Sequence, residues 1–228
     1  MKEYPLLLNG DMVRAVLDGT KTQTRRLVNP QPIVRSSGGI TWKRTDGERI
    51  PNGPRSAFGG SHVSATGLIG EYCPFGQVGD TLWVRETWRP CQPSEGKGPA
   101  IQHKADGTYD RKTDYPEAFR TKSSDGPGKW RPSIHMPRWA SRLSLKITDI
   151  RVERVNAISE GDVLAEGITQ LQGGACVAFR MLWDTIYGKQ KPNKPDLSWA
   201  ANPWVWAITF EVTRSPGHFR EPGIQAYG

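Results

Sequence analysis

The sequence predicts an α+β fold, a small mixed or antiparallel β-barrel with short flanking helices and two long loop insertions. Several short segments alternate apolar and polar residues, which is the period of a half-buried strand. Helical spacing of apolar residues is confined to short segments that begin at a capping residue and end near a glycine. Because the predicted strands do not alternate regularly with long helices, a doubly wound α/β sheet is disfavoured.

The chain begins with a predicted strand and a predicted short helix. Residues 6–8 are leucines, as expected of a short buried strand. Asp11 is a suitable N-cap for a helix over residues 12–18, and Gly19 stands where a C-terminal glycine is common. The threonines of residues 20–27 then favour an extended path out of a turn.

Two segments rich in proline, glycine and polar residues interrupt the periodic pattern. Residues 29–70 and 92–133 keep no period, so we interpret them as long loops or insertions, the second as an excursion such as a lid or a hairpin. Between them, alternation over residues 81–88 predicts a strand with charged residues near its end. We therefore predict a single domain over residues 1–228 that carries these two insertions.

The C-terminal third shows the clearest periodicity. A strand predicted over residues 143–152 changes phase near Asp149, as a bulge or bend would cause. Ser159 and Asp162 then resemble a capping-box pair at the start of a helix, and Gly167 is placed to end that helix.

A longer helix and a final strand follow. Residues 175–187 have helical spacing, and the expected core anchors of this helix are Val177, Met181, Trp183 and Ile186. Apolar residues at every second position predict a half-buried strand formed by Trp204, Trp206, Ile208, Phe210 and Val212. The tryptophans assigned to the core are Trp183, Trp204 and Trp206.

Charge and composition narrow the function classes. The chain has 228 residues, with 31 Lys and Arg against 23 Asp and Glu, which gives a net charge of +8. This charge is either ordinary surface charge or an indication that the protein binds a polyanion. No apolar run approaches the roughly 18 residues that span a bilayer. The three cysteines and four histidines show neither disulfide nor zinc spacing. We expect a cytoplasmic protein with no metal, no cofactor and no membrane partner.

The densest cluster of reactive and charged side chains is the segment 21–26, KTQTRR. A turn would bring Lys21 to Thr24, whereas a straight strand would put them on opposite faces. A lysine whose pKa is lowered by burial or by a second cation can take the proton of a threonine hydroxyl and so activate it. The alternative is a solvated basic strand edge that discourages edge pairing.

Three further groups are candidates. Glu86 is expected either to pair with Arg85, to orient a lysine, or to form only a surface cross-strand pair. Glu166 falls in the last turn of a predicted helix, where the macrodipole disfavours a carboxylate, so it is either exposed or has a cationic partner. Residues 130–139 interleave Trp, Arg and His, and form either a surface for a base or a connection that covers one end of the core.

Together these segments resemble the ASCH family of the PUA-like superfamily, most closely the larger ASCH proteins of phages and prophages. The motifs that carry the resemblance are, in chain order, PLLL (5–8), VRAVLDGTKTQTRR (13–26), GDTLWVRETW (79–88), PSIHMPRW (132–139), ISEGDVLAEGI (158–168) and NPWVW (202–206). They span almost the whole chain, whereas the two insertions show little match.

The resemblance implies a PUA-like barrel with a cleft for RNA or a modified nucleoside, and DNA is a further possible partner. Small ASCH enzymes hydrolyse the amide of N4-acetylcytidine with a Lys, a Thr and a Glu, and Lys21, Thr24 and Glu166 match these positions. The resemblance thus implies that Lys21 deprotonates Thr24 and that Glu166 orients Lys21. The candidate binding residues are Thr22, Arg25, Arg26, Trp83, Arg85, Glu86, His135, Arg138 and Trp139.

Other functions stay open on the sequence. A non-catalytic RNA- or DNA-binding module would use the same basic and aromatic residues. Other ASCH relatives cleave RNA, and an accessory protein that binds a host protein could use the tryptophan-rich regions. The two insertions could also reshape or cover the cleft, and so change the substrate.

Overall fold

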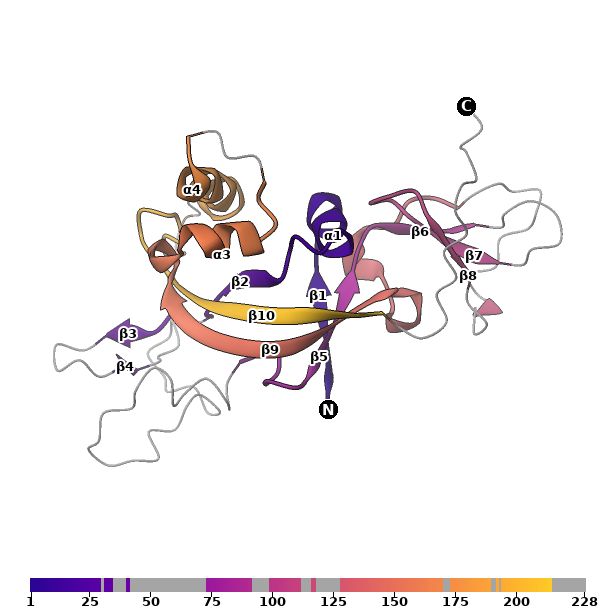
Figure 1. Ribbon diagram of the computed structural model, residues 1–228, viewed down its shortest axis with the longest axis horizontal. Coiled ribbons are helices and arrows are strands. Elements are labelled where there is room, and N and C mark those ends of the chain that lie inside the picture. The colour runs from indigo at the N-terminus through magenta and orange to yellow at the C-terminus, as the bar shows by residue number, and fades with distance from the viewer. Residues whose placement is uncertain are drawn as a thin grey trace. The chain divides into compact units, whose positions relative to one another are not determined.

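The described residues combine sheets with short helices, which confirms the predicted α+β class (Figure 1). The structure is a computed structural model that describes residues 1–29, 31–34, 40–41, 73–91, 99–111, 116–117, 128–169, 173–189, 192 and 194–214. Most of the first predicted insertion lies outside the described residues. Within it, β3 (Ile33–Val34) and β4 (Ile40–Thr41) form an antiparallel pair.

The largest sheet has five strands. Their order is β1 (Glu3–Leu7), β5 (Thr81–Arg85), β9 (Leu143–Arg154), β10 (Trp204–Arg214) and β2 (Gln23–Leu27). β1 and β5 are parallel, whereas β5 pairs with β9, and β10 with β2, in antiparallel fashion. Among the described strands, β1 and β2 stand at the two ends of this order, so a mixed sheet is seen and a closed barrel is not.

The chain divides into two compact units. Unit 1 consists of Met1–Gly19, Thr81–Lys146 and Val212–Gly228. Unit 2 consists of Thr20–Asp80 and Ile147–Glu211. Since β9 and β10 each contribute residues to both units, the predicted single domain stays a prediction.

In unit 1, the helix α1 (Gly10–Leu17) starts earlier than the sequence predicted. Asn9, not Asp11, is the N-cap, because its side-chain oxygen accepts a hydrogen bond from the Met12 N–H at 2.9 Å. Asp11 lies in the first turn and pairs with Arg14. Asn and Asp are equally good caps, and the extended backbone of Asn9 (φ −78°, ψ 172°) decides between them.

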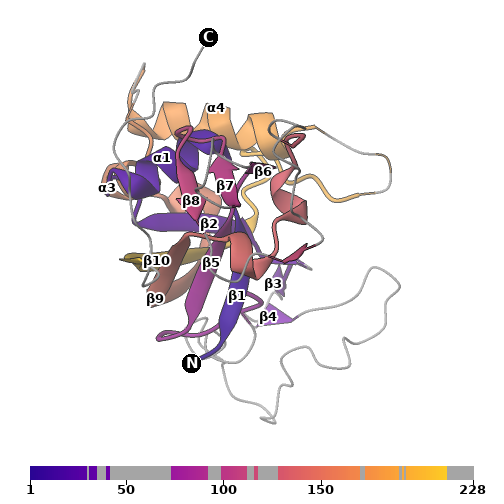
Figure 2. The same ribbon diagram turned by 90° about the vertical axis from the view of Figure 1, so that its right-hand side faces the viewer.

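The strand predicted over residues 81–88 is two strands of unit 1. β5 ends at Arg85, and β6 (Trp88–Cys91) starts a separate antiparallel sheet with β7 (Ala100–His103) and β8 (Tyr109–Arg111). Figure 2 shows these three strands next to one another. Part of the second predicted insertion is therefore a β-hairpin. Its buried face contributes to a core cluster of Trp88, Ile101, Met136 and Ala140.

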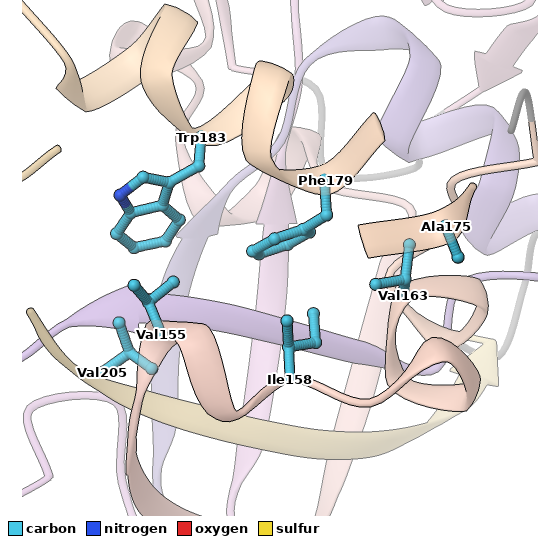
Figure 3. Close-up of a cluster of buried hydrophobic side chains, with 7 residues drawn as sticks. All are labelled: Val155, Ile158, Val163, Ala175, Phe179, Trp183 and Val205. Carbon is cyan, nitrogen blue, oxygen red and sulfur yellow. The ribbon is translucent and has the colours of Figure 1, made fainter. Parts of the chain in front are cut away.

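Unit 2 contains the helices α3 (Glu160–Ala165) and α4 (Ala175–Tyr187). In Figure 3, side chains of α4 face a buried apolar cluster to which β10 and the segment 155–158 also contribute. The cluster consists of Val155, Ile158, Val163, Ala175, Phe179, Trp183 and Val205. In the described part of the chain, no helix has both the length and the apolar character needed to cross a membrane.

The inward face of α4 differs from the predicted one. Only Trp183 of the four expected anchors is buried, whereas Val177, Met181 and Ile186 are exposed. The buried positions 175, 179 and 183 lie one turn apart on the same face of the helix. Because α4 also has apolar residues on its outer face, apolar spacing alone does not identify the inward one.

The two long strands extend beyond their predicted limits. Two consecutive exposed residues, Thr148 and Asp149, interrupt the alternation of β9, as the predicted change of phase requires. β10 is more buried than the half-buried strand that was predicted, because Val205 and Ala207 are buried as well. The residues of the predicted face that are buried are Trp206, Ile208 and Phe210.

The N-cap of α3 is expected to be worth about 1 kcal/mol of stability. The Ser159 hydroxyl accepts from the Asp162 N–H at 3.1 Å and the Asp162 carboxylate accepts from the Ser159 N–H at 3.5 Å, which confirms the predicted capping box. We expect Ser159→Ala to lower the free energy of unfolding in urea by that amount, and Ser159→Thr to retain most of it. Equal losses in both variants would argue against a capping role.

Candidate functional site

Lys21 and Glu166 are 145 residues apart in the chain and meet in unit 2. The Lys21 Nζ lies 2.8 Å from the Glu166 Oε2. An isolated antiparallel bridge joins their backbones, and next to it the Thr22 N–H donates to the Ala165 carbonyl at 2.8 Å. The bridge follows from the end of α3, where Gly167 takes a φ of 80° and turns the chain out of the helix. Lys21 is thus the cationic partner expected for Glu166.

Both side chains of this pair are buried, with 1% of Lys21 and 6% of Glu166 exposed. The three protons of the Lys21 ammonium have three acceptors, the Gln23 carbonyl, the Glu166 carbonyl and the Glu166 Oε2, each at 2.8 Å. Burial lowers the pKa of Lys21, the Glu166 carboxylate opposes this, and the nearby cations Arg26 and Arg25 add to the lowering. A lysine with a lowered pKa is suited to act as a general base.

Arg25 extends the pair into a network of charges. Its side chain is 1% exposed, and its Nη1 lies 3.3 Å from the Glu166 Oε1. Its Nη2 lies 2.6 Å from the Glu153 Oε1 and 3.1 Å from the Asp162 Oδ2. On the more exposed side of the network, Arg151 contacts Glu153 and Asp162, each at 2.9 Å. The network therefore reaches from the buried Lys21 to Arg151, whose side chain is partly accessible to solvent.

Thr24, the predicted nucleophile, lies on the other face of β2. Gln23 and Arg25 point into the charge network, so the alternation of the strand directs Thr24 away from it. Thr24 is buried and stands opposite Ile208 of β10. The three acceptors of the Lys21 ammonium do not include the Thr24 hydroxyl. Of the two paths that the sequence left open, the chain here takes the extended one.

The other two predicted residues of this segment have more solvent around them. Thr22 is exposed, and its carbonyl accepts from the Phe210 N–H at 2.9 Å. Arg26 is half-buried and stands opposite Trp206 in the β2–β10 pair.

In unit 1, the structure brings Trp83, Arg85 and Arg138 together. The guanidinium carbons of Arg85 and Arg138 lie 5.4 and 6.0 Å from the centre of the Trp83 ring. Arg138 also makes a bidentate contact with Glu3 at 2.7 and 2.8 Å, which raises the pKa of Arg138. Arg85 donates to the Ile134 carbonyl. The result is a cationic and aromatic surface of the kind that the sequence predicted for binding.

Glu86 is 1% exposed, and its partners are residues that sequence analysis did not single out. The Nε and Nη2 of Arg142 donate to its two oxygens at 2.8 and 2.9 Å, and the His103 Nδ1 lies 3.2 Å from its Oε1. Burial by itself would raise the pKa of Glu86, but His103 and Arg142 together bring it below its ordinary value. Glu86 therefore pairs with neither Arg85 nor a lysine, and its contact with a substrate stays a prediction.

The remaining predicted binding residues lie on two single-turn 3-10 helices of unit 1. His135 ends the first, Ser133–His135, and is exposed. Trp139 lies in the second, Arg138–Ala140, and is half-buried. Its ring stands edge-on to Trp88, with 5.9 Å between the ring centres. Trp139 therefore covers the core of unit 1, and part of its surface is left for a ligand.

Sequence analysis also missed Gln23, Arg151 and Glu153. The Gln23 Oε1 accepts from Arg25 at 2.7 Å, so it positions the buried guanidinium. A signal was available for Gln23, because residues 21, 23 and 25 share one face of an extended segment. No local signal existed for the other two, since their contacts with Arg25 depend on which elements of unit 2 meet.

No group of three or more His, Cys, Asp or Glu side chains that could hold a metal ion occurs within the described ranges. Comparisons of the chain with protein-family models, with curated proteins and with solved structures found no match. Family and activity therefore have to be argued from the sequence motifs and the geometry of the site.

Proposed function

We propose that this chain is an ASCH-like protein of the PUA-like superfamily that binds RNA or a modified nucleoside and hydrolyses the amide of N4-acetylcytidine-type substrates. One observation carries the proposal: the buried ion pair of Lys21 and Glu166 joins the positions that match the Lys and the Glu of the family motif. The proposal includes closure of the five-stranded sheet into a barrel and a cytoplasmic location.

In the proposed reaction, neutral Lys21 accepts the proton of the Thr24 hydroxyl while the Thr24 oxygen bonds to the amide carbonyl carbon. The same proton passes to the departing N4 nitrogen as the C–N bond breaks, which releases cytidine and leaves an acyl ester on Thr24. Water then attacks the ester, one of its two protons passes through Lys21 to the departing Thr24 oxygen, and acetic acid leaves with the other. Glu166 keeps Lys21 oriented throughout.

This mechanism places one demand on the chain. Because Thr24 and the Lys21 network lie on opposite faces of β2, residues 21–24 have to turn when substrate binds, so that the hydroxyl reaches the amine. The hydroxyl of Thr24 is therefore the group to test first.

We expect Thr24→Val to abolish the release of cytidine from N4-acetylcytidine, measured by chromatography, and Thr24→Ser to retain it. Valine keeps the shape of the buried side chain without the hydroxyl, whereas serine keeps the nucleophile. Thermal unfolding of both variants controls for folding. The hydrolase proposal fails if wild-type protein releases no cytidine, or if Thr24→Val releases it as fast as wild type.

The alternative function is a non-catalytic module that binds RNA or DNA. The observation in its favour is that all three protons of the Lys21 ammonium are donated, because an ammonium has no lone pair with which to accept the Thr24 proton. The Trp83 surface with Arg85 and Arg138 would then hold the ligand. Such a module binds nucleic acid with an affinity that falls steeply with salt and releases no cytidine.

A further inference from the structure

In unit 1, the outer face of the β6–β7–β8 sheet carries a row of side chains that shares no residue with the Lys21 network of unit 2. The register places Arg89 of β6 opposite Gln102 of β7, and Gln102 opposite Tyr109 of β8. Directly opposed residues point to the same face of a sheet, so these three form one row across the strands. The alternate positions His103 and Asp110 are buried, whereas Arg89 and Gln102 are half-buried and Tyr109 is exposed, so the row is open to solvent. On the same face, Cys91 and Ala100 are buried, so the open part of the face lies at the row and beyond Lys104.

A fourth segment of chain continues this row at the edge of β6. The Arg131 N–H donates to the Trp88 carbonyl at 2.7 Å and the Trp88 N–H to the Arg131 carbonyl at 3.2 Å, as in an antiparallel pair. The Gly128 N–H donates to the Pro90 carbonyl at 2.9 Å, and a Cβ at Gly128 would lie 2.8 Å from the Pro90 Cγ, so the close approach requires glycine. This register puts Trp130 next to the row.

The extended row is aromatic and cationic. The Arg89 guanidinium carbon lies 4.3 Å, and the Lys104 Nζ 5.9 Å, from the centre of the Trp130 ring. The Arg89 Nε donates to the Gln102 Oε1 at 2.7 Å, which orients the guanidinium. Trp130 and Tyr109 are 37% and 38% exposed. Two exposed rings thus stand in one row with fixed cations beside them.

The charged side chains at the described outward positions of these strands have one sign. The cations on the outward positions are Arg89, Lys104 and Arg111, and the described outward positions of the three strands hold no carboxylate. Asp110 faces the other side, where it is 5% exposed. Asp106, in the turn between β7 and β8, is bound to Arg142 at 2.9 Å. The face therefore favours an anionic ligand.

We propose that this outer face binds single-stranded nucleic acid. Unpaired bases stack on exposed indole and phenol rings whatever their sequence, and cations spaced along strands contact the phosphates between them. A duplex keeps its bases stacked inside and cannot offer them to Trp130 and Tyr109. This surface deepens the nucleic-acid side of the proposed function but does not depend on the chemistry at Lys21.

The test measures binding of fluorescein-labelled 12-nucleotide oligo(U) and oligo(dT) to the full chain by anisotropy, with a 12-base-pair duplex as the comparison. We expect Trp130→Ala to raise the Kd for the single strands by about 5- to 160-fold, and Trp130→Phe to retain most of the affinity. Oligo(U) and oligo(dT) differ in the thymine methyl group as well as in the 2′-hydroxyl. Oligo(dU) is therefore measured too, and the difference between oligo(U) and oligo(dU) shows whether the 2′-hydroxyl contributes.

A matched pair of arginine variants tests the charge. Arg89 lies 4.3 Å from the Trp130 ring, and Arg154 of unit 2 lies in a similar way 4.4 Å from the Trp204 ring. We expect Arg89→Gln to weaken binding and to reduce the salt slope of log Kd by about 0.7, the value for one phosphate contact on a single strand. Arg154→Gln should leave both quantities unchanged.

Several outcomes would overturn the inference. These are no binding of any single-stranded oligonucleotide, duplex binding as tight as single-strand binding, an unchanged Kd in Trp130→Ala, or equal effects of Arg89→Gln and Arg154→Gln. Circular dichroism shows whether each variant folds. Release of cytidine from free N4-acetylcytidine is measured on the same variants. Binding of the oligonucleotides without release of cytidine contradicts the proposed hydrolase. Release of cytidine without binding of the oligonucleotides contradicts the proposed nucleic-acid surface.

Discussion

Lys21→Met is expected to abolish the release of cytidine and to lower the free energy of unfolding by about 3–5 kcal/mol, the usual result of removing one partner of a buried ion pair. The ammonium of Lys21 donates to the Glu166 carboxylate and to the carbonyls of Gln23 and Glu166, and all three acceptors lose a bond. Arg25 still lies 3.3 Å from the Glu166 Oε1, which favours the lower end of this range.

The double variant Lys21→Met/Glu166→Leu separates catalysis from stability. It removes both buried charges, so we expect unfolding in urea to show that part of the lost stability returns. Arg25 keeps its carboxylate partners Glu153 and Asp162. Recovery is incomplete, because the main-chain carbonyls of residues 23 and 166 still lack the donor that Lys21 supplied. Turnover should stay absent.

Two results would count against a catalytic Lys21. The first is turnover in Lys21→Met at the rate of wild type. The second is turnover that returns together with stability in the double variant, which would mean that the pair only supports the fold. A binding module with no activity would show the same stability changes and no cytidine in any sample.

The sequence contained much of the information that places Glu166. The capping box of Ser159 and Asp162 sets the start of α3, and Gly167 with its positive φ sets the end, so Glu166 leaves the helix directly before a turn. Both signals lie within a few residues of the helix ends, so the sequence alone predicts where α3 begins and ends. A carboxylate at a helix C-terminus also requires a partner, which pointed toward a cation.

No local signal in the sequence predicts the ion-pair partners of Arg25. Glu153 lies on β9 and Asp162 on α3, and no periodicity states that these elements meet at β2. Asp162 was recognised only as a capping residue, although its carboxylate also contacts Arg151. The position of Thr24 was similarly open, since the same six residues are compatible with a turn and with a strand.

The inward face of α4 was misassigned for a different physical reason. Val177 and Met181 repeat at helical spacing just as Phe179 and Trp183 do, so two apolar faces compete. Which one is buried depends on the elements packed against the helix, and the ring of Trp199 lies 6.1 Å from that of Phe179. Spacing predicted the helix, and tertiary contacts selected the face.

Arg142→Leu is expected to lower the free energy of unfolding by about 3–5 kcal/mol, measured in urea by tryptophan fluorescence. Arg142 donates to both oxygens of the buried Glu86 carboxylate, and its removal leaves the His103 ring, at 3.2 Å, as the nearest polar side chain. Arg138→Leu is the matched control. Arg138 donates to both oxygens of Glu3 with the same bidentate geometry but is partly exposed. Its removal should therefore lower the free energy of unfolding by only about 0.2–1 kcal/mol.

The pH dependence of the stability difference between wild type and Arg142→Leu tests whether Arg142 acts through its charge. In the folded protein, the pKa of Glu86 lies below its ordinary value. The pair of Glu86 and Arg142 therefore stabilises the protein fully above about pH 4.3, the pKa of an unperturbed glutamate. This stability is lost as the pH falls through the folded pKa. We therefore expect wild type and Arg142→Leu to converge in stability at acid pH. A difference that is constant with pH would mean that Arg142 acts through packing, and equal losses in Arg142→Leu and Arg138→Leu would mean that burial does not set the strength of these pairs.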